Sequence, residues 1–421
     1  MSSPLLSPLP LPDGVTSRQI DTSPIGLSFH ILEAGYTPAR DRPLIVLLHG
    51  FPELAFSWRK VMPLLADAGY HVVAPDQRGY GRTTGWDTRE FANVDLASFC
   101  PTNLVRDILV LVHALGYQSV KCLVGHDFGA VAAALCALAR PDFFESVVLM
   151  SHPFKKIPSL PALSTADKTA ENNGGSKADS PDVHEDLAFL GRKHYKWYYS
   201  TQPASPQMTN PPQGLHDFLR GYFHLKSASW SKNNPYPLTS WTASELAKMP
   251  YYYIMPLNAT MPEAIATDMA HEDPSAIQNS STWLPDDDLA VYVSEYGRNG
   301  FQGGLNWYRV LTRAEPAAAR IRDIDILAGK RMECPIAFIS GRQDWGTYQE
   351  PGVIEKMMTP DVCADFRGLT IVDGAGHWAP QEKPEEVVDV KRVAEGAGVA
   401  RAVMVTMMVL WFTRVCQYDI T

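Results

Sequence analysis

The residues best suited to chemistry lie in the segment Gly125-His126-Asp127-Phe128-Gly129. This segment follows a short apolar run, residues 120–124, and precedes an apolar stretch typical of a helix. Glycines on both sides permit a tight turn from strand to helix, so the central side chain projects from that turn. A carboxylate there, kept ionised by the helix N-terminus, can attack carbon and form an ester. We therefore expect Asp127 to be a nucleophile, although the motif alone is more often an Asp that caps a helix.

A second segment, His49-Gly50-Phe51-Pro52-Glu53, follows the apolar run 44–48. It can place the backbone N–H of Phe51 opposite Asp127, and the N–H of Phe128 directly follows the nucleophile. Two N–H groups aimed at one oxygen form an oxyanion hole, which stabilises negative charge while an ester is hydrolysed. We predict that Phe51 and Phe128 supply this hole, although the segment alone also fits an ordinary Gly-Pro turn.

Ester hydrolysis needs a base and an acid that orients it. Among twelve histidines, His377 is the best base, because it lies in a glycine-rich segment after the last apolar run, residues 369–372. Asp344 comes 377 − 344 = 33 residues earlier, after the apolar run 336–339, and is the expected orienting acid. His152 is a competing base. The joint occurrence of these residues after successive strands makes a catalytic triad much more plausible than any motif does alone.

These residues need a parallel sheet to bring them together. Short apolar runs that stop at Gly, Asp, Ser or His read as strands buried on both faces; they span residues 44–48, 71–74, 120–124, 147–150, 336–339 and 369–372. Helical stretches separate several of them, at residues 58–68, 102–115 and 130–138. This alternation predicts a doubly wound α/β domain.

The alternation stops near residue 154 and resumes near residue 333, and the intervening region is rich in aromatic residues. We predict a core in two parts with an inserted, mainly helical lid. The expected divisions are core 1–154, lid 155–330, core 331–390 and an atypical tail 391–421. Within the lid, residues 164–186 are poor in large apolar side chains, which predicts a flexible surface loop.

Composition excludes several classes of protein. The chain has 421 residues, of which 45% are hydrophobic and 20% are charged, which is typical of a chain with a large core. The formal net charge of −9 argues against nucleic-acid binding. The six cysteines form no CxxC pair, so we expect neither a zinc site nor a disulfide scaffold, and a reduced, cytoplasmic setting. No apolar segment is long enough to span a membrane.

Taken together, the motifs resemble the epoxide hydrolase branch of the α/β-hydrolase fold. The resemblance also includes the segments Trp58-Arg59, Asp76-Gln77-Arg78-Gly79-Tyr80-Gly81, and Asn306-Trp307-Tyr308-Arg309. The long aromatic lid is similar to epoxide-hydrolase-like enzymes of filamentous fungi, some of which serve secondary metabolism. The resemblance implies hydrolysis of a small apolar epoxide by water to a vicinal diol, in secondary metabolism or detoxification. It implies no cofactor and no metal, and a monomer or homodimer.

The resemblance also assigns two lid tyrosines that donate a proton to the epoxide oxygen. Tyr308 matches the family motif closely, and Tyr195 is the better match for the other tyrosine, with Tyr198 and Tyr199 as alternatives. A phenol with a pKa of ~10 stays protonated at neutral pH and can donate to an alkoxide. Aromatic residues near the motifs predict an apolar substrate pocket, although an ordinary core contains the same residue types; they are Trp58, Trp307, Trp345 and Trp378.

Two other functions share this pattern. A hydrolytic dehalogenase also uses an Asp nucleophile, but such enzymes usually have Asn at the position of Phe51 or Arg at the position of Phe128. Epoxide hydrolases themselves often have Trp at the position of Phe128, so the pocket wall departs from the family pattern. A catalytically silent binding protein is the other alternative, weakened by the presence of Asp127, Asp344 and His377 together. An esterase or peptidase would normally carry Ser or Cys at position 127.

Overall fold

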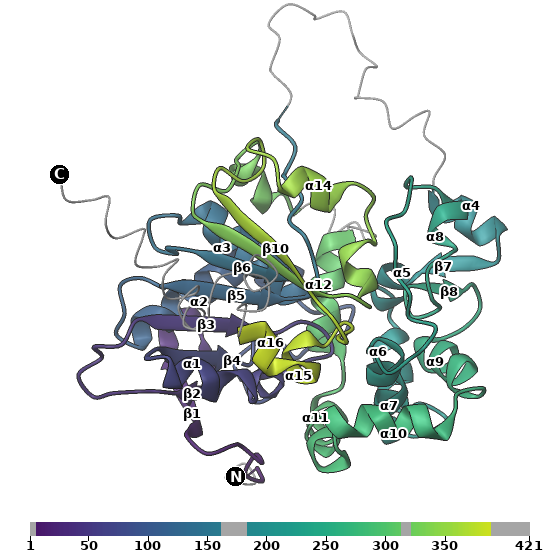
Figure 1. Cartoon of the computed structure of the whole chain (residues 1–421), viewed down its shortest axis with the longest axis horizontal. Helices are drawn as coiled ribbons and strands as arrows, with labels where there is room; N and C mark the ends of the chain where they lie inside the picture. Colours follow the sequence, from purple (N-terminus) through teal and green to yellow (C-terminus); the bar gives the residue numbers. More distant parts are fainter. Residues whose placement is uncertain (1–5, 161–182, 313–320, 389–421) are drawn as a thin grey trace, which may run out of the picture.

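The computed structural model describes residues 6–160, 183–312 and 321–388. An eight-stranded sheet forms its centre, in the order β1-β2-β4-β3-β5-β6-β9-β10 (Figure 1). Neighbouring strands are parallel from β4 to β10. At the opposite edge β1 pairs antiparallel with β2, and β2 pairs antiparallel with β4. The strands are β1 (Val15–Thr22), β2 (Leu27–Ala34), β3 (Leu44–Leu48), β4 (His71–Pro75), β5 (Cys122–His126), β6 (Val147–Met150), β9 (Ile336–Gly341) and β10 (Phe366–Val372).

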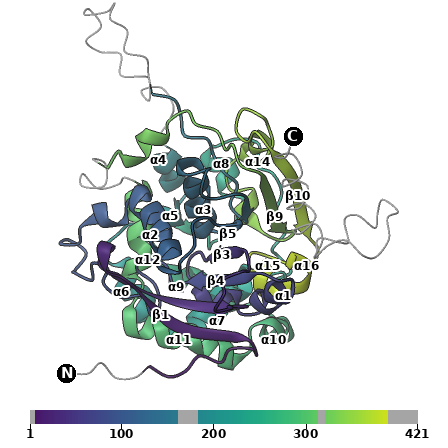
Figure 2. The ribbon, with the colours of Figure 1, turned by 90° about the vertical axis from the view of Figure 1, so that its left-hand side faces the viewer.

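Helices cover both faces of this sheet (Figure 2). On one face α2 (Pro101–Ala114) and α3 (Phe128–Ala139) pack over Val46 and Leu48 of β3. On the other face α1 (Val61–Asp67) and α16 (Pro384–Val388) pack over the alternate residues of the same strand. Successive side chains of a strand point to opposite faces, so a strand between two helical layers must be apolar throughout. The predicted doubly wound α/β domain is confirmed.

The lid is inserted between β6 and β9 and lies beside the core, on the right in Figure 1. Its helices are α4 (Val183–Phe189), α5 (Tyr195–Tyr199), α6 (Ala204–Thr209), α7 (Leu215–Leu225), α8 (Ala243–Leu246), α9 (Met261–Met269), α10 (Pro274–Trp283), α11 (Asp286–Asn299) and α12 (Gln302–Thr312). The same region also contains a two-stranded sheet, β7 (Arg192–His194) with β8 (Ile254–Pro256), and a short 3-10 helix, η4 (Asp323–Leu327). The lid is therefore mainly helical, as expected.

Two differences from the sequence-based expectation have physical reasons. The strands β1 and β2 were not predicted, and β1 buries only three of its eight residues, so it lacks a continuous apolar run. Residues 183–186 fall in the predicted loop but begin α4, whose Leu187 is completely buried. The rest of that loop, residues 164–182, and the predicted tail 391–421 lie outside the described residues.

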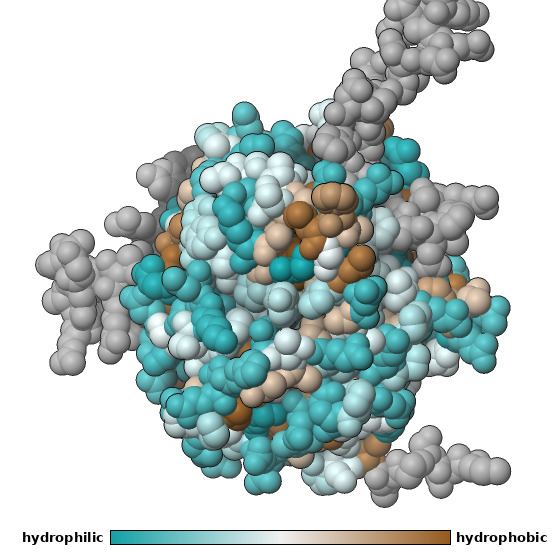
Figure 3. Space-filling model, turned by 90° about the vertical axis from the view of Figure 1, so that its right-hand side faces the viewer, coloured by the Kyte–Doolittle hydropathy of each residue, from teal (hydrophilic) through white to brown (hydrophobic). Residues whose placement is uncertain are grey.

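The described residues can also be compared with the expectations about membrane spans, cysteines and metal sites. None of their helices is long and apolar enough to cross a membrane. Their five cysteines are all buried and free, and no group of three or more His, Cys, Asp or Glu among them is placed to hold a metal ion. The face of the molecule on the lid side is mostly hydrophilic, with its largest group of hydrophobic residues in the upper middle of the view and smaller ones elsewhere (Figure 3).

Candidate active site

Asp127 lies at the sharp turn between β5 and α3. Its backbone adopts φ 52° and ψ −116°, a conformation that non-glycine residues rarely adopt and that costs on the order of 1–3 kcal/mol. The turn also needs Gly129, because a Cβ atom there would lie 2.1 Å from the carbonyl oxygen of Leu48. Close contact between α3 and β3 therefore depends on the glycine, and the turn directs the carboxylate away from the strand.

The loop after β3 meets this carboxylate. The backbone N–H of Phe51 donates to Asp127 Oδ1 over 3.1 Å, and the Phe51–Pro52 peptide bond is cis. A Cβ atom on Gly50 would lie 2.4 Å from the Asp127 Cβ, so only glycine allows the loop to come this close. Phe128 is the first residue of α3, where backbone N–H groups have no partner within the helix. The predicted oxyanion donors thus flank Asp127.

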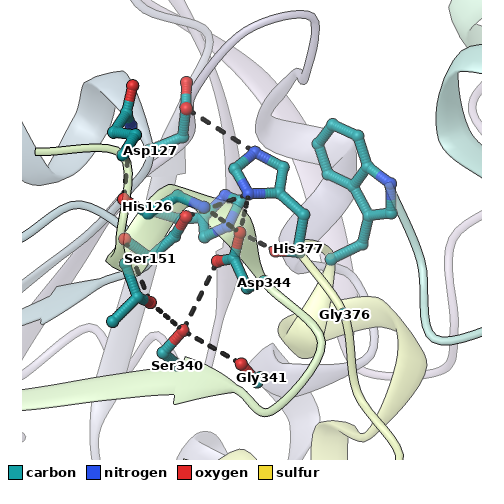
Figure 4. A network of polar contacts seen from close by, with 12 residues as sticks. His126, Asp127, Ser151, Ser340, Gly341, Asp344, Gly376 and His377 are labelled. Atoms are coloured by element: carbon teal, nitrogen blue, oxygen red, sulfur yellow. Dashed lines mark hydrogen bonds and ion pairs between the residues drawn. The ribbon is translucent and has the colours of Figure 1, made fainter. Parts of the chain in front are cut away.

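His377 and Asp344 meet Asp127 from the ends of neighbouring strands (Figure 4). The Nδ1 atom of His377 lies 2.9 Å from Asp344 Oδ1, and its Nε2 atom lies 3.5 Å from Asp127 Oδ2. Because Asp344 accepts a hydrogen bond from Nδ1–H, Nε2 carries a lone pair that points toward the nucleophile. That Nε2 atom has no hydrogen-bond partner in the described part of the chain. The triad predicted from three separate motifs therefore assembles in one place.

Sequence reasoning missed residues that hold the triad. Ser151 Oγ lies 2.9 Å from His377 Nδ1, and the backbone N–H of Gly346 donates to Asp344 Oδ1 over 2.7 Å. Ser340 donates to the other oxygen of Asp344 over 3.4 Å (Figure 4). Ser151 directly follows a predicted strand, which was the available signal, but serine at a strand end is too common to single out.

A buried ion pair between His126 and Glu53 lies beside the triad. The imidazole of His126 contacts Glu53 through Nδ1 over 2.5 Å and the carbonyl oxygen of His377 through Nε2 over 2.7 Å. Glu53 also accepts the backbone N–H of Gly50. Burial disfavours the charged imidazole, but the negative charge of Glu53 and its hydrogen bond outweigh burial and raise the pKa of His126 to about 9. This pair therefore connects the Phe51 loop, the Asp127 turn and the His377 loop.

The local charges suit a nucleophile and a base. Burial favours the neutral carboxyl of Asp127, but the charges of His377 and Lys226 outweigh it and hold the pKa below its usual value. Burial likewise opposes ionisation of Asp344, whose pKa the His377 charge and hydrogen bond lower to about 2. Burial and the charge of Lys226 lower the pKa of His377, against the opposing effect of Asp344. Asp127 is thus ionised and His377 neutral near neutral pH.

Lys226 was not among the predicted residues. It is 4% exposed and follows α7, and its carbonyl oxygen accepts the backbone N–H of His377 over 2.8 Å. Its ammonium lies near four aromatic rings, with distances to the ring centroids of 4.9–5.9 Å; the rings are those of Tyr222, Tyr252, Tyr253 and Trp378. Aromatic faces attract a cation, so this cage holds a positive charge beside the triad.

Tyr195 of α5 and Tyr308 of α12 face the nucleophile across one cavity of about 510 Å³. Their ring centroids are 5.9 Å apart, and both side chains line that cavity together with Asp127. Burial and the charge of Asp127 raise the pKa of Tyr195 well above its ordinary value, and burial with the neighbouring Tyr195 does the same for Tyr308. Both phenols therefore remain protonated and able to donate.

The alternative tyrosines point elsewhere. The hydroxyl of Tyr198 donates to Gln207 over 3.0 Å, and that of Tyr199 donates to Tyr222 over 3.1 Å. Neither is among the residues that line the cavity. The structure therefore brings Tyr195, rather than Tyr198 or Tyr199, together with Asp127.

The four tryptophans predicted for the pocket do not line this cavity. Trp58 packs in the cluster around α1, on the other face of the sheet, and Trp307 donates its indole N–H to the carbonyl of Arg78. Trp345 packs against Tyr236, and Trp378 donates to the carbonyl of Phe223. Sequence proximity to a motif does not fix the direction of a side chain, because packing within helices and loops decides it. Two lid residues, Trp197 and Trp241, line the cavity instead.

The cavity is also more polar than predicted. Beside the apolar side chains of Phe128, Val131 and Leu311, it is lined by histidines, lysines and an acid; these are His152, Lys155, His184, His194, Lys196 and Glu350. The competing base His152 lies in this lining, but its Nδ1 atom faces the carbonyl oxygen of Pro153 rather than an acid. It therefore lacks the orientation that Asp344 gives His377.

Comparisons with known proteins agree with this geometry. Residues 43–184 match a family model described as the alpha/beta hydrolase fold. The chain is 30% identical to epoxide hydrolase A of Mycobacterium tuberculosis over 380 residues, which cover 88% of this chain and 94% of the relative. It is 27% identical to an epoxide hydrolase of Caballeronia sordidicola, covering 88% and 91% of the two chains.

Solved structures give the same result. An epoxide hydrolase from an endophytic Streptomyces has a TM-score of 0.66 at 27% identity, with 89% of this chain and 93% of that chain covered. Potato epoxide hydrolase I has a TM-score of 0.64 at 26% identity, with 91% and 99% covered. The chain therefore belongs to the epoxide hydrolase family of the α/β-hydrolase fold.

Proposed function

We propose that this protein hydrolyses an epoxide to a vicinal diol in two steps. In the first step the Asp127 carboxylate attacks an epoxide carbon, and the C–O bond of the ring breaks. Tyr195 and Tyr308 hydrogen-bond the ring oxygen, and one of them transfers its proton as the alkoxide forms. The product of this step is a hydroxyalkyl ester of Asp127. The two phenols that line the Asp127 cavity support this assignment.

In the second step His377 takes a proton from water, and the resulting hydroxide attacks the ester carbonyl of Asp127. Asp344 stabilises the imidazolium that forms, because its carboxylate accepts a hydrogen bond from His377 Nδ1–H. The N–H groups of Phe51 and Phe128 stabilise the oxyanion, and the C–O bond of the ester then breaks. As that bond breaks, the imidazolium of His377 gives its proton to the leaving oxygen, and the diol leaves. The new carboxyl group of Asp127 gives its proton to the tyrosinate, so that Asp127 is again a carboxylate, His377 is neutral and the phenol is restored.

One observation carries this proposal. The free Nε2 atom of His377 lies 3.5 Å from Asp127 Oδ2, and the same carboxylate lies in a cavity with Tyr195 and Tyr308. A dehalogenase needs the first arrangement but not the two phenols. An esterase needs a hydroxyl or thiol at position 127.

We also propose a cytoplasmic, monomeric or homodimeric enzyme of secondary metabolism or detoxification. The five free, buried cysteines of the described residues support a reducing compartment. The other parts of this proposal rest on resemblance to fungal epoxide-hydrolase-like enzymes.

A single turnover of styrene oxide in 18O-labelled water tests the chemistry. Water attacks the Asp127 carbonyl, so we expect the label in the peptide that contains Asp127 and unlabelled diol in the first turnover. Asp127→Asn is expected to abolish diol formation. Turnover with the label only in the diol would contradict the ester route. Chloroacetate and 1-chlorobutane, assayed for chloride release, should give no product; chloride release without diol formation would favour a dehalogenase.

A further inference from the structure

One carboxyl group outside the triad binds the backbone on both sides of His377. Glu382 is the last residue of α15 (Ala379–Glu382), which follows the His377 loop directly. Its Oε1 atom accepts the backbone N–H of Trp378 over 3.0 Å, and its two oxygens share the N–H of Gly376 over 3.0 and 3.1 Å. The residues before and after the base are therefore both tied to one side chain.

The same carboxyl group also binds the lid. Glu382 Oε2 accepts the backbone N–H of Ala228, which follows α7, over 2.8 Å. In the opposite direction, the backbone N–H of His377 donates to the carbonyl oxygen of Lys226 over 2.8 Å. The approach is close, because a Cβ atom on Gly376 would lie 2.5 Å from a carbonyl carbon of this lid segment. The loop that holds the base is therefore fastened to the lid.

The partners of Glu382 come from two regions of the molecule. Within the described part of the chain no cation pairs with Glu382, and backbone N–H groups are its partners. The N–H of Trp378 lies at the start of α15, where a side chain of the same helix commonly accepts it. A local helix cap does not account for the bond from Ala228 in the lid. Glu382 therefore links the lid to the base as well as capping a helix.

The two steps of the proposed reaction depend differently on this loop. In the first step Asp127 attacks carbon, and the Phe51 N–H and the turn before α3 orient its carboxylate. In the second step Nε2 of His377, which lies 3.5 Å from Asp127 Oδ2, must take a proton from water beside the ester. A displacement of about 1 Å can lower the rate of such a step about 10²-fold. The loop should therefore matter for hydrolysis of the ester and little for its formation.

We propose that Glu382 is a positioning residue that holds His377 in place for hydrolysis of the ester intermediate, and that it makes this placement depend on the lid. This inference rests on the proposed function. Glu382 does not touch the reacting atoms but acts through the backbone on either side of the base. Displacement of the lid segment would remove both the bond from Ala228 to Glu382 and the acceptor of the His377 N–H.

Rapid mixing followed by acid quenching measures the two steps separately. Burial, with the charge of Asp344, raises the pKa of Glu382 to about 7 against the opposing effect of its hydrogen bonds, so the assay is run at about pH 8.5, where the carboxylate predominates. Excess enzyme is mixed with styrene oxide, and mass spectrometry follows the ester on the Asp127 peptide and the diol.

Two substitutions of Glu382 should slow the second step alone. Glu382→Gln keeps the shape of the side chain but replaces one accepting oxygen by an NH2 group, so the rate of ester hydrolysis should fall about tenfold. Glu382→Ala removes every one of these bonds and should lower that rate about 10²-fold. The rate of ester formation should stay within about twofold in both variants, so the ester accumulates.

Glu385→Gln is the matched control. Glu385 lies on neighbouring α16, is exposed and takes no part in these hydrogen bonds, so both of its rates should equal those of the wild type. Thermal melts of the three variants show that each is folded. A rate of ester formation that is kept in the Glu382 variants provides the same check within the assay itself.

The outcomes of these measurements are distinguishable. Unchanged ester hydrolysis in both Glu382 variants would overturn the positioning role while leaving the epoxide hydrolase function intact. An equal fall in both steps would also overturn it, because it would show a general effect on the fold. Formation of diol by the wild type without any ester on Asp127 would instead contradict the proposed function itself.

Discussion

The core and the lid hold their active-site groups by different means. The core groups Asp127, Asp344 and His377 follow the carboxyl ends of parallel strands, and hydrogen bonds fix each of them. The lid groups Tyr195 and Tyr308 lie on separate helices and are held mainly by contacts between aromatic rings. The core thus supplies charge in a fixed geometry, whereas the lid supplies neutral donors through packing.

Because of this difference, substitutions in the core and in the lid should affect different properties of the enzyme. Loss of a core group removes a charge that other buried charges balance, so its effects should extend to pKa values and stability. Loss of a lid hydroxyl leaves the ring in place, so its effect should be confined to the step in which the phenol donates. Lys226 joins the two regions, because a residue of the lid brings a cation to the core triad.

The largest effects in the lid are expected from the two cavity phenols. Tyr195→Phe and Tyr308→Phe should each lower kcat/KM for an epoxide by roughly 10²–10³-fold, because each removes a proton donor from the ring-opening step. Their thermal stability should change little. Steady-state kinetics and thermal melts measure both quantities.

Tyr199→Phe is the matched control in the same helix. Its hydroxyl bonds to Tyr222 rather than facing the cavity, so it should lose about 1 kcal/mol of unfolding free energy and less than about fivefold in activity. A larger loss of activity in Tyr199→Phe than in Tyr195→Phe would show that the two tyrosines have been assigned in the wrong order.

A smaller effect is expected where the lid reaches the core. The charge of Lys226, together with burial, lowers the pKa of His377, which must be neutral to accept a proton. In Lys226→Met that pKa should rise, so the acidic limb of the kcat profile should move to higher pH. The profile reports the deacylation step when the ester accumulates. An unmoved or oppositely moved limb would mean that Lys226 serves only packing.

The smallest effect concerns the stability of the core. The folded-state pKa of His126 is about 9, above the ordinary value of 6.5, so its contribution is complete below pH 6.5 and is lost as the pH rises through 9. Denaturant unfolding should show a decline on the order of 1–3 kcal/mol across this interval. His126→Gln should flatten that part of the curve. A stability that rises over the same interval would exclude the ion pair with Glu53.

The core could be predicted from the sequence because its signals are local. Residues 44–48 form a strand with the expected bounds, since a strand buried on both faces must be continuously apolar. The turn at Asp127 needs glycines at fixed positions, which the sequence displays directly. The triad follows because parallel strands end at one edge of a sheet.

The lid was harder to predict because packing decides the direction of its side chains. Tyr195, Tyr198 and Tyr199 occur within one short helix at spacings of three and four residues, so periodicity alone cannot separate them. Lys226 has no motif, and its role depends on rings from distant segments. The charged residues of the cavity lining were also missed, because Lys196 and Glu350 are far apart in the sequence.

Trapping the ester intermediate tests the central claim most directly. In His377→Gln the first step can proceed while hydrolysis of the ester is blocked. After incubation with an epoxide, the intact protein should gain the mass of one substrate molecule, located on the peptide that contains Asp127. The double variant Asp127→Asn/His377→Gln should gain nothing. Absence of the adduct in His377→Gln, under conditions in which the wild type forms diol, would contradict the account, as would an adduct on another residue.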